Sequence, residues 1–151
     1  MINICILTSS IELSETIIQY FNKIYLNINV SCIISNNLES NIINKFRRYK
    51  IKTYFTNKYK EIDKILTESN IHYIILADYN DNTPKNFTNK YKWRLINHKE
   101  TDTELLIYYV NINFSKNDII FKIKKDNSNI KIFYPIIIEK IITETFYKLF
   151  N

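Results

Sequence analysis

The chain has 151 residues, of which 46% are hydrophobic and 24% charged; this composition excludes a disordered chain and fits one folded domain over residues 1–151. Glycine is absent, although average usage of about 7% would place roughly ten glycines in this length. The single alanine and the abundance of Ile, Asn, Lys and Tyr indicate an AT-rich genome. Because that bias also raises the lysine content, the net charge of +6 is weak evidence for nucleic-acid binding.

The first half of the chain alternates short apolar runs with segments of helical periodicity. We expect strands at four such runs, residues 3–7, 30–34, 51–55 and 72–77. The first helix is expected after Ser9, because Ser9 and Glu12 have the spacing of a capping box. Further helices are expected from Leu38 to Tyr49 and around residues 59–66. Strands that alternate with helices predict a parallel sheet with helices on both faces.

The second half of the chain has a different pattern, which begins with a polar loop at residues 78–86. The segments expected to be strands are 93–97, 105–114 and 118–125. The last two alternate apolar and polar residues and are joined by residues 115–117, so they predict an antiparallel pair in a mixed sheet. From about Asn127 the chain has a helical apolar face, and we expect Pro135 to kink or break that helix.

The two cysteines and the hydropathy pattern indicate the cellular compartment of the protein. Cys5 and Cys32 lie inside apolar runs, so we expect buried, reduced thiols with no metal or redox role. The sequence has no signal-peptide pattern and no apolar run of about 18 residues. We therefore expect a cytoplasmic protein that does not bind a membrane.

In this order, seven short segments resemble the glycinamide ribonucleotide formyltransferases, a family of folate-dependent enzymes, over nearly the whole chain. The segments are NICILTSS (3–10), IISNN (33–37), IKT (51–53), LADY (76–79), TPKNF (83–87), RLIN (94–97) and FYPIII (133–138). The resemblance implies a three-layer, Rossmann-like α/β fold with a mostly parallel sheet and an antiparallel C-terminal strand pair. It also implies transfer of a formyl group from the cosubstrate 10-formyltetrahydrofolate to an amine, without a metal.

The resemblance assigns roles to nine residues of this chain. Asn97, His98 and Asp118 match the Asn and His of the family's Asn-x-His motif and its later Asp, which polarise the formyl carbonyl and handle the proton of the amine. Thr8, Ser9 and Ser10 replace the Gly-rich loop that binds the substrate phosphate. Asp78, Tyr79 and Asn80 lie in the loop that binds the folate.

Three features depart from the family pattern. His98 follows Asn97 directly, and neighbouring side chains of a strand point to opposite faces. Either a bulge or turn therefore brings His98 round, or Lys99 occupies the family's His position. Glu12 lies in the first turn of the expected helix, where it repels a phosphate. Residues 99–104 replace a longer segment that forms part of the family's active-site wall.

These departures leave several functions open. The first is formyl transfer to the small molecule phosphoribosylglycinamide in purine biosynthesis. A methionyl-tRNA formyltransferase shares the same core and fits the spacing from Pro84 to Asn97 about equally well. A third possibility is a catalytically impaired relic of the fold that binds folate or a partner chain. A fourth is a basic protein that associates with nucleic acid.

Overall fold

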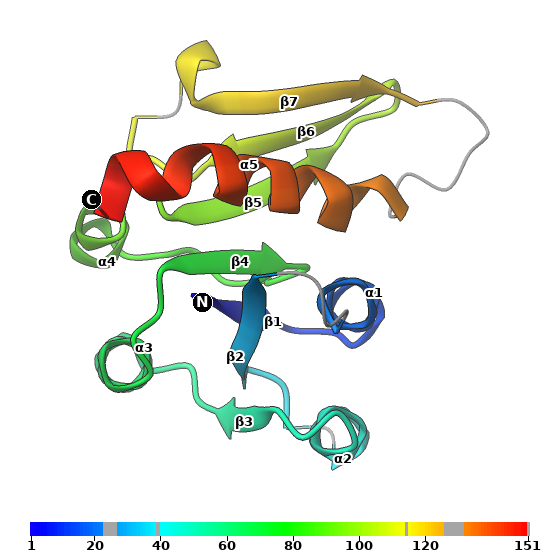
Figure 1. The fold of residues 1–151 in the computed structure, drawn as a ribbon, viewed down its shortest axis with the longest axis vertical. Coiled ribbons are helices and arrows are strands. Elements are labelled where there is room, and N and C mark those ends of the chain that lie inside the picture. Colours follow the sequence, from blue (N-terminus) through cyan, green and yellow to red (C-terminus); the bar gives the residue numbers. More distant parts are fainter. Residues whose placement is uncertain (23–26, 39, 114, 126–131, 151) are drawn as a thin grey trace.

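The structure is a computed structural model that describes residues 1–22, 27–38, 40–113, 115–125 and 132–150. A seven-stranded sheet runs through the molecule in the order β3-β2-β1-β4-β5-β6-β7 (Figure 1). The strands are β1 (Ile2–Thr8), β2 (Ile28–Ser35), β3 (Lys52–Phe55), β4 (Tyr73–Ala77), β5 (Leu95–Glu100), β6 (Glu104–Tyr109) and β7 (Ile119–Lys124). The first five are parallel, and β6 and β7 are antiparallel to their neighbours.

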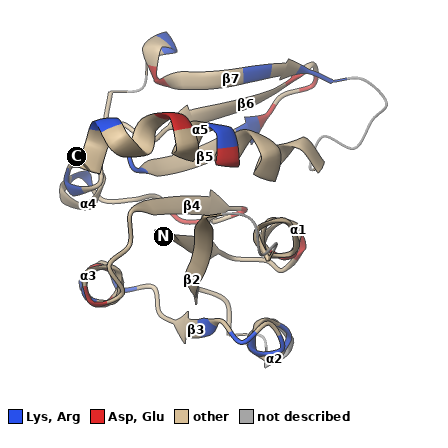
Figure 2. Ribbon diagram, in the orientation of Figure 1, with Lys and Arg blue, Asp and Glu red and all other residues tan. Residues whose placement is uncertain are grey.

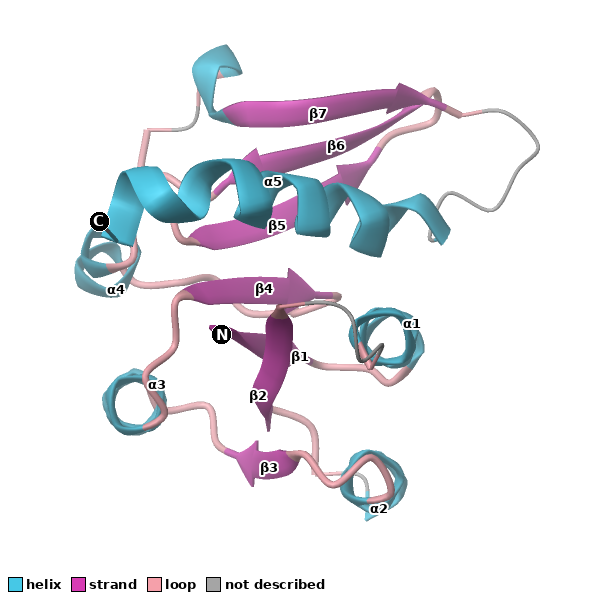
Figure 3. Ribbon diagram, in the orientation of Figure 1, coloured by secondary structure: helices cyan, strands magenta, loops and turns pink. Residues whose placement is uncertain are grey.

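Helices cover both faces of the sheet and form three layers (Figure 3). They are α1 (Glu12–Phe21), α2 (Ser40–Arg47), α3 (Tyr59–Glu68), α4 (Lys85–Lys90) and α5 (Phe133–Phe150). One apolar cluster joins α1, α2 and α5 to the sheet, with Ile17, Phe46 and Ile138 at its centre. A second cluster joins α3 and α4 to the other face through Ile62 and Phe87. The predicted mixed α/β sheet is therefore confirmed.

Among the described residues, four turns place a residue other than glycine in the left-handed region. Lys50, Asn70 and Trp93 follow α2, α3 and α4, and Asp78 follows β4; their φ values are 58°, 50°, 67° and 52°. Glycine normally occupies such positions because it has no Cβ, although Asn and Asp tolerate this region better than other residues. The turns therefore keep the left-handed geometry typical of glycine, but the residues that adopt it have side chains that can form contacts.

Several expected element boundaries are wrong. Ser9 does not cap α1: that helix starts at Glu12, its N-cap residue Ile11 has helical dihedral angles, and no side chain caps it. The hydroxyl of Ser9 instead lies within hydrogen-bond distance of the side chains of loop residues Asn36 and Asn80. Leu38 precedes α2 and is 72% exposed, so it does not belong to the apolar face of that helix.

The C-terminal half also differs from expectation. β5 starts at Leu95, because Trp93 adopts the left-handed conformation, and continues to Glu100. The expected strand start at Asp118 is wrong, because Asp118 ends a 3-10 helix whose N-cap is Ser115. Pro135 does not interrupt α5: it lies in the first turn, where its missing N–H has no helical partner to lose. The earlier part of the expected helix, residues 126–131, lies outside the described residues.

Cys5 and Cys32 are buried free cysteines, as predicted, at paired positions of β1 and β2. Burial raises the pKa of Cys5, so this thiol is neutral and packs as part of the core. No helix among the described residues has the length and apolar content to cross a membrane.

Candidate functional site

A cavity of about 340 Å³ opens beyond the carboxyl end of β4, on one face of the β5–β6 pair. Leu76 of β4 and Leu106, Tyr108 and Val110 of β6 and its exit give the cavity apolar surface. The polar lining comes from Asn97 and Lys99 of β5, the loop residues Asp81, Asn82 and Thr83, and Asn111. In open α/β sheets, ligands bind outside the carboxyl ends of the strands, and this volume lies in the range of about 300–1,000 Å³ usual for small-molecule sites.

The two residues of the expected motif, Asn97 and His98, lie on opposite faces of β5. The pairing of β5 with β6 is regular from Ile96 to Glu100, with Asn97 opposite Tyr108 and His98 opposite Ile107. No bulge brings His98 round, so Asn97 faces the cavity and His98 faces α5. Lys99 lies on the same face as Asn97 and lines the same cavity. On this strand Lys99, and not His98, is the neighbour that shares the cavity face with Asn97.

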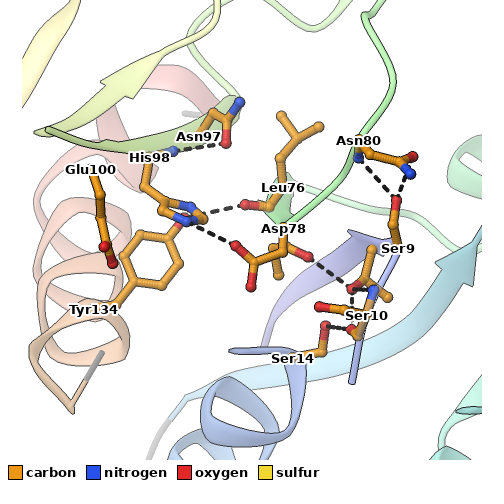
Figure 4. Close-up of polar contacts among 12 residues, drawn as sticks. Ser9, Ser10, Ser14, Leu76, Asp78, Asn80, Asn97, His98, Glu100 and Tyr134 are labelled. Carbon is orange, nitrogen blue, oxygen red and sulfur yellow. Dashed lines mark hydrogen bonds and ion pairs between the residues drawn. The ribbon is translucent and has the colours of Figure 1, made fainter. Parts of the chain in front are cut away.

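The amide of Asn97 has a defined orientation. Its Oδ1 accepts a hydrogen bond from the backbone N–H of His98 at 2.8 Å, which turns Nδ2 away from the strand (Figure 4). The Asn97 side chain also hydrogen-bonds Tyr108. Burial raises the pKa of Tyr108 and that hydrogen bond opposes the rise, so at neutral pH Tyr108 is a neutral phenol. Asn97 and Tyr108 thus supply hydrogen-bond donors at the cavity.

His98 belongs to a separate polar group between β4, β5 and α5. Its Nε2 lies 3.2 Å from Oδ1 of Asp78, and its ring centroid lies 4.8 Å from that of Tyr134 (Figure 4). The His98 side chain is 12% exposed and that of Asp78 is 37% exposed. The Nδ1 atom of His98 is buried without a hydrogen-bond partner among the described residues. A proton on Nε2, facing Asp78, leaves Nδ1 as a lone-pair acceptor.

Tyr134 holds α5 against this group. Its hydroxyl donates a hydrogen bond to the carbonyl of Leu76 at 3.4 Å. Burial raises the pKa of Tyr134 well above its ordinary value, and the charge of Asp78 raises it further, so Tyr134 is a neutral donor. The left-handed conformation of Asp78 places its carboxylate toward His98 while its backbone carbonyl accepts from the N–H of Ser9.

Asp118 lies outside the cavity lining and is only 3% exposed. Its Oδ2 accepts from the backbone N–H of Ser115 at 2.8 Å, which caps the 3-10 helix. Its Oδ1 is 3.4 Å from Nδ2 of Asn111, which does line the cavity. The structure therefore does not bring Asn97, His98 and Asp118 into one cluster, and Asp118 reaches the cavity only through Asn111.

The loop after β1 is closed by its own hydrogen bonds. The N–H of Ser10 donates to Thr8 Oγ1 at 3.1 Å, and the N–H of Ser9 donates to Asp78. Ser9 Oγ lies 2.7 Å from Oδ1 of both Asn36 and Asn80. Two backbone donors that a phosphate needs are therefore already used in this arrangement.

The residues expected to bind folate point away from the cavity. Asp78 faces His98, Asn80 bonds Ser9, and Tyr79 packs against the α3–α4 cluster. The next residues of the same loop, Asp81 and Asn82, line the cavity in their place. Sequence reasoning missed Tyr108 and Asn111, whose signal is only that they lie on or just after the strand expected to pair beside Asn97.

Charged groups are distributed unevenly around this site. Lys and Arg residues occur on α2, β3, α4 and β7 (Figure 2). Among the described residues that line the cavity, Lys99 is the cation and Asp81 is the acidic residue. Among the described residues, no group of three His, Cys, Asp or Glu side chains is placed to hold a metal ion.

The sheet order and the helical layers are those of the formyltransferase fold. No protein-family model and no curated protein matches the sequence. Solved structures do match the fold, which confirms the resemblance at that level.

Phosphoribosylglycinamide formyltransferase from Anaplasma phagocytophilum superposes with a TM-score of 0.79 and 16% identity, covering 95% of this chain and 88% of that one. The enzyme of the same name from Bacillus halodurans gives 0.78 and 16%, covering 95% and 96%. A formyltetrahydrofolate deformylase from Pseudomonas putida gives 0.71 and 12%, covering 95% of this chain and 60% of that one. At such identities the likeness establishes the fold alone.

Proposed function

We propose that this protein binds 10-formyltetrahydrofolate in the cavity beside β5 and transfers its formyl group to an amine. The observation that carries this proposal is the Asn97 amide, which is oriented by the His98 N–H and presented to a cavity at the carboxyl edge of a formyltransferase fold. The names of the structural neighbours, two phosphoribosylglycinamide formyltransferases and a formyltetrahydrofolate deformylase, support this choice of chemistry.

The lining of the cavity suits a flat, nitrogen-rich ring. Leu76, Leu106 and Val110 offer apolar contact, whereas Asp81 and Asn111 offer a hydrogen-bond acceptor and an amide. Sites for such ligands combine apolar walls with a few placed polar groups. A bound 10-formyltetrahydrofolate supplies the formyl group, whose bond to the folate nitrogen breaks as a bond to the amine forms, while the amine's proton ends on that nitrogen.

The chain's own residues divide the work in this proposal. Asn97 donates a hydrogen bond to the formyl oxygen, where negative charge develops. His98 lies with Asp78 on the opposite face of β5 and its Nδ1 atom is buried, so it acts as a positioning residue for the strand, and water in the open cavity carries the amine's proton to the folate nitrogen. Asp118 acts as a positioning residue, because its carboxylate holds the amide of Asn111 at the cavity.

The finer part of the proposal is the acceptor, phosphoribosylglycinamide. Its support is the name shared by several structural neighbours. In that case Thr8, Ser9 and Ser10 bind the phosphate after the N–H groups of Ser9 and Ser10 release their present acceptors. Glu12 and Glu15 in the first turn of α1 oppose an anion there, so the acceptor has to be tested separately from the donor.

The test combines calorimetric titration with a formyl-transfer assay on purified protein. We expect binding of 10-formyltetrahydrofolate and transfer to an amine, with Asn97→Ala lowering kcat by about 10²–10³-fold. Asn29→Ala, on a strand far from the cavity lining, is the matched control and should keep full activity. Activity of Asn97→Ala equal to that of the wild type would sink the proposal. Comparing phosphoribosylglycinamide with its unphosphorylated analogue then decides the acceptor.

A second candidate is a folate-binding protein without transfer activity. It is favoured by the separation of Asn97 from His98 across β5 and by the use of Asp118 as a helix cap. In that case the titration shows tight folate binding, whereas the transfer assay shows no turnover above that of Asn97→Ala.

A further inference from the structure

Lys99 shares with Asn97 the face of β5 that lines the cavity. The two residues are separated by one position on a regular strand, so their side chains leave the sheet on the same side. Their partners on β6 confirm this arrangement, because Asn97 is opposite Tyr108 and Lys99 is opposite Leu106, and all four residues line the cavity. His98 lies opposite Ile107, which is buried in the cluster under α5.

Lys99 is also the cation of the cavity lining, and it has no ion pair among the residues that the structure describes. Two other lysines of the same strand region are paired: Lys122 lies 3.6 Å from Glu104, and Lys125 lies 3.4 Å from Glu100. The charge of Lys99 is thus available at the mouth of the cavity, next to the oriented amide of Asn97.

We propose that Lys99 is a catalytic residue that contacts the formyl oxygen of the folate bound in this cavity. This inference rests on the proposed function and deepens it. The Lys99 ammonium and the Nδ2 of Asn97 approach one carbonyl oxygen from the same strand face and stabilise the negative charge that develops on it. His98 cannot share that contact, because its ring lies on the opposite face between Asp78 and Tyr134.

The two faces of β5 therefore have different roles. Asn97 and Lys99 polarise the carbonyl on the cavity face, whereas His98 and Asp78 lie on the α5 face and only support the strand. Changes at Lys99 should therefore alter how the protein senses the formyl group, and changes at His98 should not.

Binding of two stable folate analogues tests the contact without turnover. The probes are 10-formyl-5,8-dideazafolate, carrying ¹³C in the formyl group, and 5,8-dideazafolate, which lacks that group. We expect the wild type to bind the formyl compound about tenfold more tightly, as one charge-assisted hydrogen bond allows. We also expect the formyl C=O stretch to move to lower frequency in the infrared difference spectrum.

Lys99→Met should abolish the preference and return the stretch toward its solution value, whereas Lys99→Arg should keep both. Lys122→Met is the matched control, since Lys122 lies opposite Leu106 on β7, and it should behave as the wild type. His98→Gln is measured beside it, because His98 lies on the opposite face of β5. Thermal unfolding of each variant checks that the exposed Lys99 can be replaced without loss of the fold.

The outcomes distinguish this inference from the proposed function. If the wild type binds both compounds and Lys99→Met keeps the preference and the shifted stretch, Lys99 does not contact the formyl group and the inference is overturned. The same holds if His98→Gln, rather than Lys99→Met, removes them. If the wild type binds neither compound, the proposed folate site itself is refuted, and the role of Lys99 with it.

Discussion

Polar residues have opposite uses at the two ends of the parallel strands, which we call the amino edge and the carboxyl edge of the sheet. At the amino edge, where β4 and β5 begin, His72 Nδ1 accepts the backbone N–H of Asn3 at 2.9 Å. Arg94 donates to the carbonyls of Ile71 and His72 and lies over the ring of Phe150. At the carboxyl edge, Asn97 and Lys99 line an open cavity.

The difference shows that polarity alone does not identify a site. His72 and Arg94 are as polar as His98 and Lys99, but their hydrogen-bonding groups are used to join β1, β4, β5 and α5. The carboxyl edge keeps donors directed at a cavity. Changes at the amino edge should therefore cost stability without affecting binding, and changes at the cavity should do the reverse.

The largest expected effect comes from filling the cavity with Leu106→Trp. Leu106 lines the cavity from β6 and is partly exposed, so a larger side chain occupies ligand space without displacing the core. We expect affinity for 10-formyltetrahydrofolate to fall by more than about 100-fold, or roughly 2.7 kcal/mol, in calorimetry. The urea-unfolding midpoint should stay near that of the wild type. Unchanged affinity in a folded variant would place the ligand elsewhere.

Arg94→Met is the opposite test, at the amino edge. The substitution keeps the apolar stem but removes the donors to Ile71 and His72 and leaves those carbonyls without their charged partner. We expect the free energy of unfolding to fall by about 2–3 kcal/mol in urea titration. Folate affinity of the folded protein should remain within twofold. A loss of affinity without a loss of stability would contradict the division between the two edges.

The fold could be predicted because apolar runs and helical periodicity survive without glycine. The parallel strands from Ile2 to Ala77 and the antiparallel pair β6–β7 follow from those patterns. The start of α1 could not be predicted, because the Ser9 hydroxyl hydrogen-bonds Asn36 and Asn80, which are distant in the sequence. The role of Pro135 depended on where α5 begins, which apolar periodicity alone does not fix.

The site was predicted only in part, for a reason of register. The alternation of side chains predicted that Asn97 and His98 would separate unless a bulge intervened, and regular pairing from Ile96 to Glu100 shows that none does. That Tyr108 stands opposite Asn97 depends on the length of the hairpin between β5 and β6. The His98–Asp78 contact joins two strands and a left-handed turn, which no local pattern indicates.

Asp118→Ala tests a residue that contributes both to stability and, indirectly, to the cavity. Its carboxylate caps the 3-10 helix through Ser115 and reaches the cavity only through Asn111. We expect a loss of about 1–2 kcal/mol in the free energy of unfolding, because a buried cap is removed. Formyl transfer by the folded variant should fall less than about tenfold, as for a positioning residue. A fall of 100-fold or more would instead make Asp118 part of the reacting centre.

The smallest effect is a pH dependence of stability at the amino edge. Burial lowers the pKa of His72, and the positive charges of Arg94 and of the N-terminus lower it further. The unfolded chain therefore binds this proton more readily than the folded protein. Stability is full above the ordinary His value of about 6.5 and declines as the pH falls from there through the lower folded value.

Urea unfolding at pH 7.5 and pH 5.5 measures this decline. His72→Gln should reduce the difference between the two pH values, because it removes the group that titrates while leaving a side-chain acceptor for the N–H of Asn3. Phe146 and Phe150 enclose the ring of His72, so a charge there is also poorly solvated, which acts in the same direction. If the decline is as large in His72→Gln as in the wild type, groups other than His72 cause it, and the assignment to this histidine is wrong.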